Sequence, residues 1–233
     1  MLAGVLALAL VTPPFLARER FADDVALLRP EARDVPAALL VLGGVAALTR
    51  MDAHPSAQVA THAPGVLSRF EPLGRYAVGN GLGLASLGVG LARHDGRWAS
   101  AGVAFLEANL LSSLLVSGLQ SLAGRARPGT PHAGEFGRGG SSFPSAHAAH
   151  AFAAAGVAYA SLPEFGGRWV FPAVASLVAL SRVADRKHFL ADVGFSAGAG
   201  WWIGTRLGAS GRRHGRWEVA VAPARLAVRW VGP

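Results

Sequence analysis

Residues 146–162 read AHAAHAFAAAGVAYASL, a stretch that is apolar almost throughout and rich in alanine. It is too long for a strand and shows no alternation of apolar and polar residues, so it predicts a helix. Small residues of this kind let helices pack closely in a bilayer. Five more segments share the composition: 36–48, 76–92, 99–123, 169–183 and 189–207. The sequence therefore predicts an all-α bundle of about six helices.

The composition favours a membrane protein. Hydrophobic residues make up 52% of the chain and charged residues only 15%, a charged share well below that of ordinary soluble domains. The alternative is an all-helical soluble domain, because several segments are shorter than the roughly 20 residues that span a bilayer. Polar residues also interrupt the apolar faces, at Asn80, Glu107, Asn109 and Gln120. We expect transmembrane helices.

No stretch of the chain reads as a flexible linker, so residues 1–233 are treated as one domain. The apolar run 3–11 is too short to span a bilayer, which makes residues 1–20 either a signal sequence or an interfacial segment. Five glycines and a proline within 129–143 predict a loop between two helices. The catalytic helices are expected within 99–208.

The C-terminal tail, residues 211–233, differs from the rest. It opens with a basic, glycine-bounded turn at 211–215. Residues 217–230 then alternate around Pro223, which predicts a short β-hairpin.

The positive charge is unusual in kind. The net charge is +8, yet Lys187 is the only lysine, and the arginines are spread over short segments between helices. Nucleic-acid binding would need a clustered basic face, so this class is excluded. Arginines at helix ends instead fit anchoring at a lipid interface. With no cysteine, the chain has no disulfide, thiolate metal site or cysteine nucleophile.

Three clusters of reactive side chains stand at the ends of apolar helices. The first is Arg-Ala-Arg-Pro at 125–128, and the second is Ser-Phe-Pro-Ser-Ala-His at 142–147. The third is Ser181-Arg182, followed by His188 and Asp192. Each alone is a weak signal.

Together they resemble the signature of the type 2 phosphatidic acid phosphatase superfamily, which includes bacterial class A acid phosphatases and vanadium haloperoxidases. That signature is lysine, six residues, Arg-Pro; then Pro-Ser-Gly-His; then Ser-Arg, five residues, His, three residues, Asp. Arg127-Pro128 matches the end of the first motif. Residues 144–147 match the second with Ala146 in place of glycine, and the third is complete. The resemblance covers residues 120–204.

The chain departs from the signature at one charged position. The lysine expected seven residues before Arg127 is the neutral Gln120. Gln120 can donate a hydrogen bond to a phosphoryl oxygen but supplies no charge. Arg125 is the nearest candidate to supply it, although its different spacing changes its direction from a helix.

Phosphate chemistry agrees with these residue types. A phosphoryl transition state spreads negative charge over three oxygens, which Arg127 and Arg182 can hold through bidentate guanidinium groups. Ser145 stands where a helix begins, so its hydroxyl and the N–H groups of Ala146 and His147 would face an anion.

The two histidines receive different expected roles. His188 and Asp192 are four residues apart, so on a helix the aspartate would accept from one imidazole nitrogen and leave the other free. The resemblance implies that His188 is the nucleophile, that Asp192 orients it and that His147 is the general acid. His150, on the same helix face as His147, is read as structural or pocket-lining.

We expect neither a metal nor another cofactor. The spacing of His147, His150, His188 and Asp192 follows no familiar ligand motif. Arginines around the same centre would also repel a cation.

The resemblance implies a phosphatase that acts on the phosphomonoester or pyrophosphate group of a lipid-linked substrate through a phospho-histidine. By the positive-inside rule, arginines at the opposite end of the bundle, such as Arg93, Arg97 and Arg168, mark the cytoplasmic side. The site would then face outward from a multi-pass protein of the inner membrane. The alternatives are a soluble secreted acid phosphatase, a non-catalytic binder of lipid phosphate and, more remotely, a vanadium-dependent oxidant. The sequence does not predict an oligomeric state.

Overall fold

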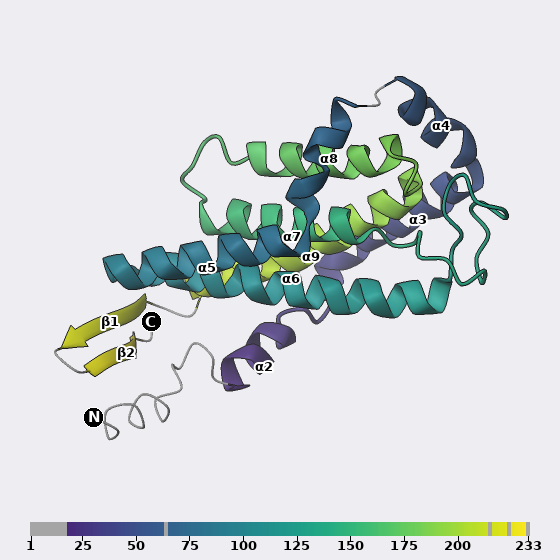
Figure 1. Ribbon diagram of the computed structural model, residues 1–233. Helices are drawn as coiled ribbons and strands as arrows, with labels where there is room; N and C mark the ends of the chain where they lie inside the picture. The colour runs from purple at the N-terminus through teal and green to yellow at the C-terminus, as the bar shows by residue number, and fades with distance from the viewer. Residues whose placement is uncertain (1–17, 63–64, 214–215, 223–224, 232–233) are drawn as a thin grey trace, which may run out of the picture.

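The computed structural model describes residues 18–62, 65–213, 216–222 and 225–231, and most of this part of the chain is helical (Figure 1). The α-helices are α2 Arg18–Ala26, α3 Val35–Met51, α4 Ala53–His62, α5 Tyr76–Arg93, α6 Gly96–Ala123, α7 Ala146–Ser161, α8 Val170–Ala184 and α9 Leu190–Arg213. Two 3-10 helices are η2 Ala32–Asp34 and η3 Leu67–Gly74. The predicted all-α bundle is confirmed.

The six helices expected from the sequence are α3 and α5 to α9, and most of their ends lie within a few residues of those predicted. The pattern missed α2, α4 and η3, which are short and carry more polar residues. The basic turn expected at 211–215 is wrong for residues 211–213, because α9 continues to Arg213. Arginine is a good helix former, which favours this continuation. The apolar run 3–11 lies outside the described residues.

The tail forms the predicted hairpin. Strand β1, Arg216–Ala222, pairs antiparallel with β2, Arg225–Val231, and the register places residue 217 opposite residue 230. Pro223 itself lies outside the described residues.

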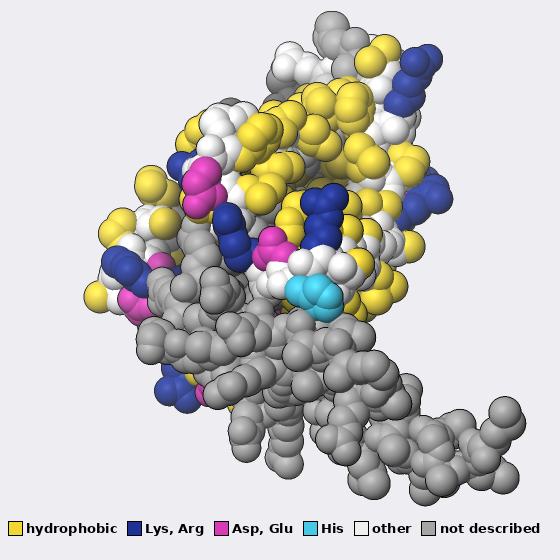
Figure 2. Space-filling view, turned by 90° about the vertical axis from the view of Figure 1, so that its left-hand side faces the viewer, with side chains coloured by type: hydrophobic (Ala, Val, Ile, Leu, Met, Phe, Trp, Pro, Cys, Tyr) yellow, Lys and Arg dark blue, Asp and Glu magenta, His cyan; other side chains and the backbone are white. Residues whose placement is uncertain are grey.

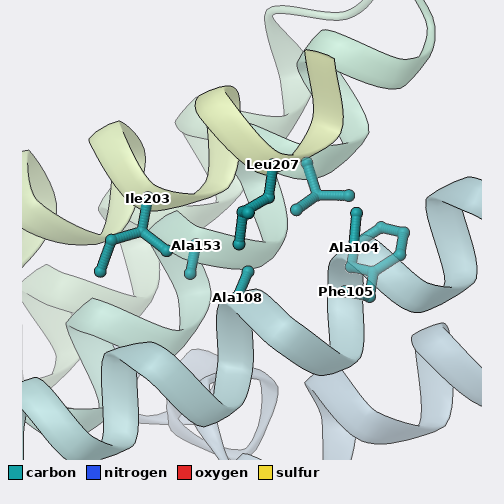
Figure 3. Packing of buried hydrophobic residues seen from close by; sticks show 7 residues of the cluster. Ala104, Phe105, Ala108, Ala153, Ile203 and Leu207 are labelled. Carbon is teal, nitrogen blue, oxygen red and sulfur yellow. The ribbon is translucent and has the colours of Figure 1, made fainter. Parts of the chain in front are cut away.

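Helices α7 and α9 pack closely along the middle of the bundle because glycines face their contact. A Cβ added at Gly204 would lie 2.1 Å from the carbonyl oxygen of Ala153, and one at Gly200 would lie 2.3 Å from that of Ala149. Figure 3 shows Ile203 and Leu207 of α9 packed with residues of α6 and α7. Small residues therefore set the distance between the helices that carry the second and third motifs.

Within the described residues, two helices are long and apolar enough to cross a membrane. They are 32–50, which has no buried residue, and 96–123, which is partly buried in the bundle. Helix α6 ends at Gly124, which adopts the left-handed conformation that favours glycine. The chain then turns into the loop 129–143 at one end of the bundle (Figure 1).

Candidate active site

Four helix ends bring the three motifs together beside the loop 129–143. Arg127 follows α6, Ser145 is the N-cap of α7, and Arg182 is in the last turn of α8. His188 lies just before α9 and Asp192 in its first turn. Direct contacts join these segments: Ser145 N–H donates to Ser196 Oγ of α9 at 2.7 Å, and Ser196 Oγ donates to the Asp192 carbonyl at 2.7 Å.

His188 is buried, and its Nδ1 lies 2.6 Å from the carbonyl oxygen of Ser142. A carbonyl only accepts, so Nδ1 carries the proton of a neutral ring and Nε2 keeps its lone pair. Asp192 Oδ2 is 3.8 Å from Nδ1, beyond hydrogen-bond distance. The direct bond expected from the spacing is therefore absent, since His188 precedes the helix and the four-residue rule does not apply to it.

Asp192 supports His188 through Ser142 instead. Its Oδ2 accepts from Ser142 Oγ at 2.6 Å and from the Phe189 N–H at 2.8 Å. The first bond fixes the residue whose carbonyl holds His188, and the second fixes the residue that follows it. Asp192 thus orients the histidine through two neighbours rather than by contact.

Arg125 does not supply the missing charge to the cleft. Its side chain is 2% exposed, with Nη1 2.5 Å from Asp192 Oδ1 and Nη2 2.9 Å from Asp52 Oδ2. The Nε donates to the Gly134 carbonyl at 3.1 Å, and the guanidinium lies over the Phe189 ring at 4.4 Å. A buried charge needs such pairing. The expectation that Arg125 compensates for Gln120 is corrected, because every nitrogen of its guanidinium is already bonded within the protein.

Asp52 is a site residue that sequence reasoning missed. It lies between α3 and α4, is buried, and accepts from the Ala191 N–H at 3.0 Å. Burial raises the pKa of Asp52 even though this N–H and Arg125 favour its charged form. An aspartate directly after an apolar helix was its only signal.

Gln120 fastens the loop that carries Ser145. Its Nε2 donates to the carbonyl oxygens of Pro144 at 2.9 Å and Ser141 at 3.3 Å. Both amide hydrogens are used in this way, so Gln120 holds backbone rather than aiming a donor at a phosphoryl group. That differs from the phosphate-binding role expected for it.

The other predicted phosphate-binding residues keep polar atoms unpaired. Three buried side-chain atoms, one from each motif, have no hydrogen-bond partner in the described part of the chain: Arg127 Nε, Ser145 Oγ and Arg182 Nε. Leaving such a group without a partner costs about 1–3 kcal/mol. The N–H of Ala146 lies in the first turn of α7, where backbone donors lack helical acceptors. This set of atoms fits an anionic ligand.

Glu71 of η3 is a second residue that the motifs did not predict. Its Oε1 lies 2.8 Å from His147 Nε2 and 3.8 Å from Arg182 Nη1, and its Oε2 lies 3.1 Å from Arg75 Nη2. Burial alone would raise the pKa of Glu71, but its hydrogen bond with Arg75 and the neighbouring His147 and Arg182 outweigh burial and hold the pKa below its usual value. No pattern in the sequence marked this residue.

A cavity of about 700 Å³ runs between α5, α6, α7 and α8 and reaches Arg75, the ion-pair partner of Glu71. Arg75 and His150 line one part of it, and Asp95 and Arg97 line another. Most of its remaining lining is aliphatic or aromatic, including Leu82, Phe105, Leu162 and Phe171. Figure 2 views the end of the bundle away from the loop 129–143 and shows a hollow lined by hydrophobic side chains. His150 contacts Ser113 Oγ at 2.9 Å and packs against Tyr76, which fits its expected structural role.

Among the described residues, no group of three or more His, Cys, Asp and Glu side chains is arranged to hold a metal. The site as built is a set of arginines, a histidine pair and a helix N-terminus, which is the chemistry of an oxyanion site.

Comparison with known proteins assigns the region that carries these motifs to a protein family. The sequence model of the PAP2 superfamily matches residues 101–213. This region belongs to the PAP2 superfamily. The match spans all three motifs, so the resemblance seen in the sequence is confirmed. Membership of the PAP2 superfamily supports a phosphatase.

The fold has a PAP2 counterpart among solved structures. The crystal structure of the first transmembrane PAP2 type phosphatidylglycerolphosphate phosphatase from Bacillus subtilis is similar, with a TM-score of 0.55 and 20% identity. The alignment covers 76% of this chain and 94% of that one. No curated protein matches the sequence. Asp52 and Glu71 precede the PAP2 match, which is why motif reasoning did not reach them.

Proposed function

We propose that the protein is a membrane-embedded, metal-independent PAP2 phosphatase that removes a phosphoryl group from a lipid-linked substrate through a phospho-histidine on His188. The observation that supports the proposal is the set of three unpaired polar atoms, one from each motif, beside a buried histidine with a free Nε2.

In the first step, His188 Nε2 attacks phosphorus and the bond to the leaving oxygen breaks. His147 donates a proton to that oxygen, so the leaving group departs as an alcohol or as a protonated phosphate. In the second step, water attacks the phospho-histidine, His147 takes its proton, and inorganic phosphate is released. Arg127 and Arg182 hold the charge on the phosphoryl oxygens in both steps.

The apolar cavity favours a lipid over a small soluble ester. It adjoins Arg75 and His150, near His147, and its hydrophobic lining suits a hydrocarbon chain. The transmembrane nature of the similar Bacillus subtilis enzyme and the exposed apolar α3 agree with a multi-pass inner-membrane protein. The distribution of arginines favours a site that faces the periplasm or the outside.

The test is phosphate release by the detergent-purified protein from phosphatidic acid, phosphatidylglycerol phosphate, a polyprenyl pyrophosphate and nitrophenyl phosphate, each with and without EDTA. We expect release from at least one lipid, faster than from the soluble ester and unchanged by EDTA. Loss of turnover in EDTA that Mg²⁺ or Zn²⁺ restores would contradict metal independence.

The same experiment separates the alternative functions. Recovery of the protein without detergent and a preference for soluble esters would indicate a secreted acid phosphatase. Binding without release would indicate a lipid-phosphate binder.

A further inference from the structure

Glu71 places a carboxylate among the groups assigned to the phosphoryl transfer. Its Oε1 is 2.8 Å from the nitrogen of His147 that would protonate the leaving group, and 3.8 Å from Arg182. Carboxylate and phosphoryl oxygens are both anionic acceptors and are recognised by the same cations. The position that Glu71 occupies is therefore one that a substrate oxygen needs.

The segment that carries Glu71 is tied to the site. Ser68 Oγ donates to Asp185 Oδ1 at 2.5 Å, and Arg182 Nη1 donates to the other oxygen of Asp185 at 3.3 Å. At the other end of η3, a Cβ on Gly74 would lie 2.8 Å from the carbonyl oxygen of His147, so the two backbones touch. These contacts hold Glu71 over His147 and Arg182.

Arg75 gives the carboxylate a second partner, on the side away from His147. Its Nη2 donates to Glu71 Oε2 at 3.1 Å, and its side chain is 61% exposed. When the first oxygen leaves His147, the glutamate keeps this ion pair. Displacement then does not strand a buried charge, which would be costly.

We propose that Glu71 is a resident competitor for the phosphate site: its carboxylate pairs with His147 and Arg182 when the site is empty, and an entering phosphoryl group displaces it toward Arg75. The inference rests on the proposed function, because it needs these residues to bind phosphate. Its consequence is a site that holds free phosphate weakly and releases the product readily. The negative charge stays close to the bound anion after displacement and continues to repel it.

The test is calorimetric titration of the detergent-purified full chain with inorganic phosphate and with orthovanadate. Glu71→Gln keeps the shape of the side chain and removes its charge, so both anions should bind about tenfold more tightly or better, because a repulsive charge within a few Å is removed. Glu164→Gln is the matched control, since that glutamate is exposed and pairs with Arg97. It should leave both affinities unchanged. Product inhibition by phosphate should strengthen in parallel in Glu71→Gln alone.

An unchanged or weaker affinity for phosphate in Glu71→Gln overturns the inference. Removing the charge of a glutamate with only a structural role would not tighten anion binding. Arg182→Gln separates this failure from failure of the proposed function. If it abolishes phosphate binding, the phosphate site stands whatever Glu71 does. If phosphate binding does not depend on Arg182, the site assignment fails and the inference with it. Should Glu71→Gln not fold, Glu71→Asp retracts the carboxylate by one methylene and should also bind phosphate more tightly than the wild type; no gain there overturns the inference.

Discussion

His188 and His147 differ in what surrounds their ring nitrogens. The Nδ1 of His188 is held by a backbone carbonyl, which leaves Nε2 nucleophilic, whereas His147 faces the acid Glu71. We expect His188→Ala to abolish turnover of every substrate. His147→Ala should keep measurable activity on nitrophenyl phosphate, whose leaving group needs no proton, and lose it on alkyl phosphates. Comparing kcat/KM for the two esters checks this. Equal losses in the His147 variant would contradict its role as the acid.

Gln120 gives a second prediction at the residue scale. Because its amide donates to two carbonyls of the loop before Ser145, Gln120→Met should lower turnover by leaving both carbonyls without their donor. Gln120→Lys retains a donor and should keep most of the wild-type rate. The measurement is the rate of phosphate release by Gln120→Met and by Gln120→Lys, each compared with the wild type. Equal rates in both would mean that these hydrogen bonds do not position the loop.

At the scale of elements, Asp52 connects α3 and α4 to the site through Arg125, Asp192 and Ser142. Asp52→Asn removes one partner of a buried ion pair, a change that typically costs about 3–5 kcal/mol. We expect a lower melting temperature and a kcat that falls more than KM changes, because His188 loses its support while the substrate contacts remain. The exposed Asp23→Asn is the control. Unchanged kcat in a less stable Asp52→Asn would limit its role to folding.

The contact between α7 and α9 depends on glycine. Gly204→Ala would place a methyl group 2.1 Å from the Ala153 carbonyl, so the helices must separate, at a typical cost of about 1–3 kcal/mol. Gly118→Ala is the matched control at an exposed position of α6, where a Cβ meets nothing within 4 Å. It should be neutral or stabilise by about 0.5–1 kcal/mol, since alanine is the better helix former. Thermal unfolding in detergent distinguishes the two. Equal melting temperatures would show that the interface can relax.

At the scale of the whole molecule, local sequence patterns predicted the fold better than they predicted the contacts within the site. Apolar composition and length placed six helices, and motif spacing named the residues that gather near His188. The patterns could not show that Arg125 would be buried against Asp52 and Asp192, which are 73 and 67 residues away in the chain. Such pairings depend on how the helices pack. Glu71 was missed for the same reason, because η3 reaches the site only in three dimensions.

The orientation of the bundle in the membrane is a property of the whole molecule that a labelling experiment can test. The loop 129–143 lies at the active end, and Arg138 there is about half exposed. Glu164, between α7 and α8, marks the opposite end and is 74% exposed. The chain has no cysteine, so single substitutions at these positions give labelling without background.

If the end with Arg93, Arg97 and Arg168 is cytoplasmic, as the positive-inside rule indicates, a membrane-impermeant maleimide should label Arg138→Cys in intact spheroplasts. It should label Glu164→Cys only after lysis. The reverse pattern would place the site in the cytoplasm and make the substrate a lipid phosphate of the inner leaflet. Labelling of both before lysis, with the protein in the soluble fraction, would contradict a membrane-spanning bundle. The active end also carries arginines, but we propose that Arg127 and Arg182 bind phosphate there, so the remaining charge still favours an outward-facing site.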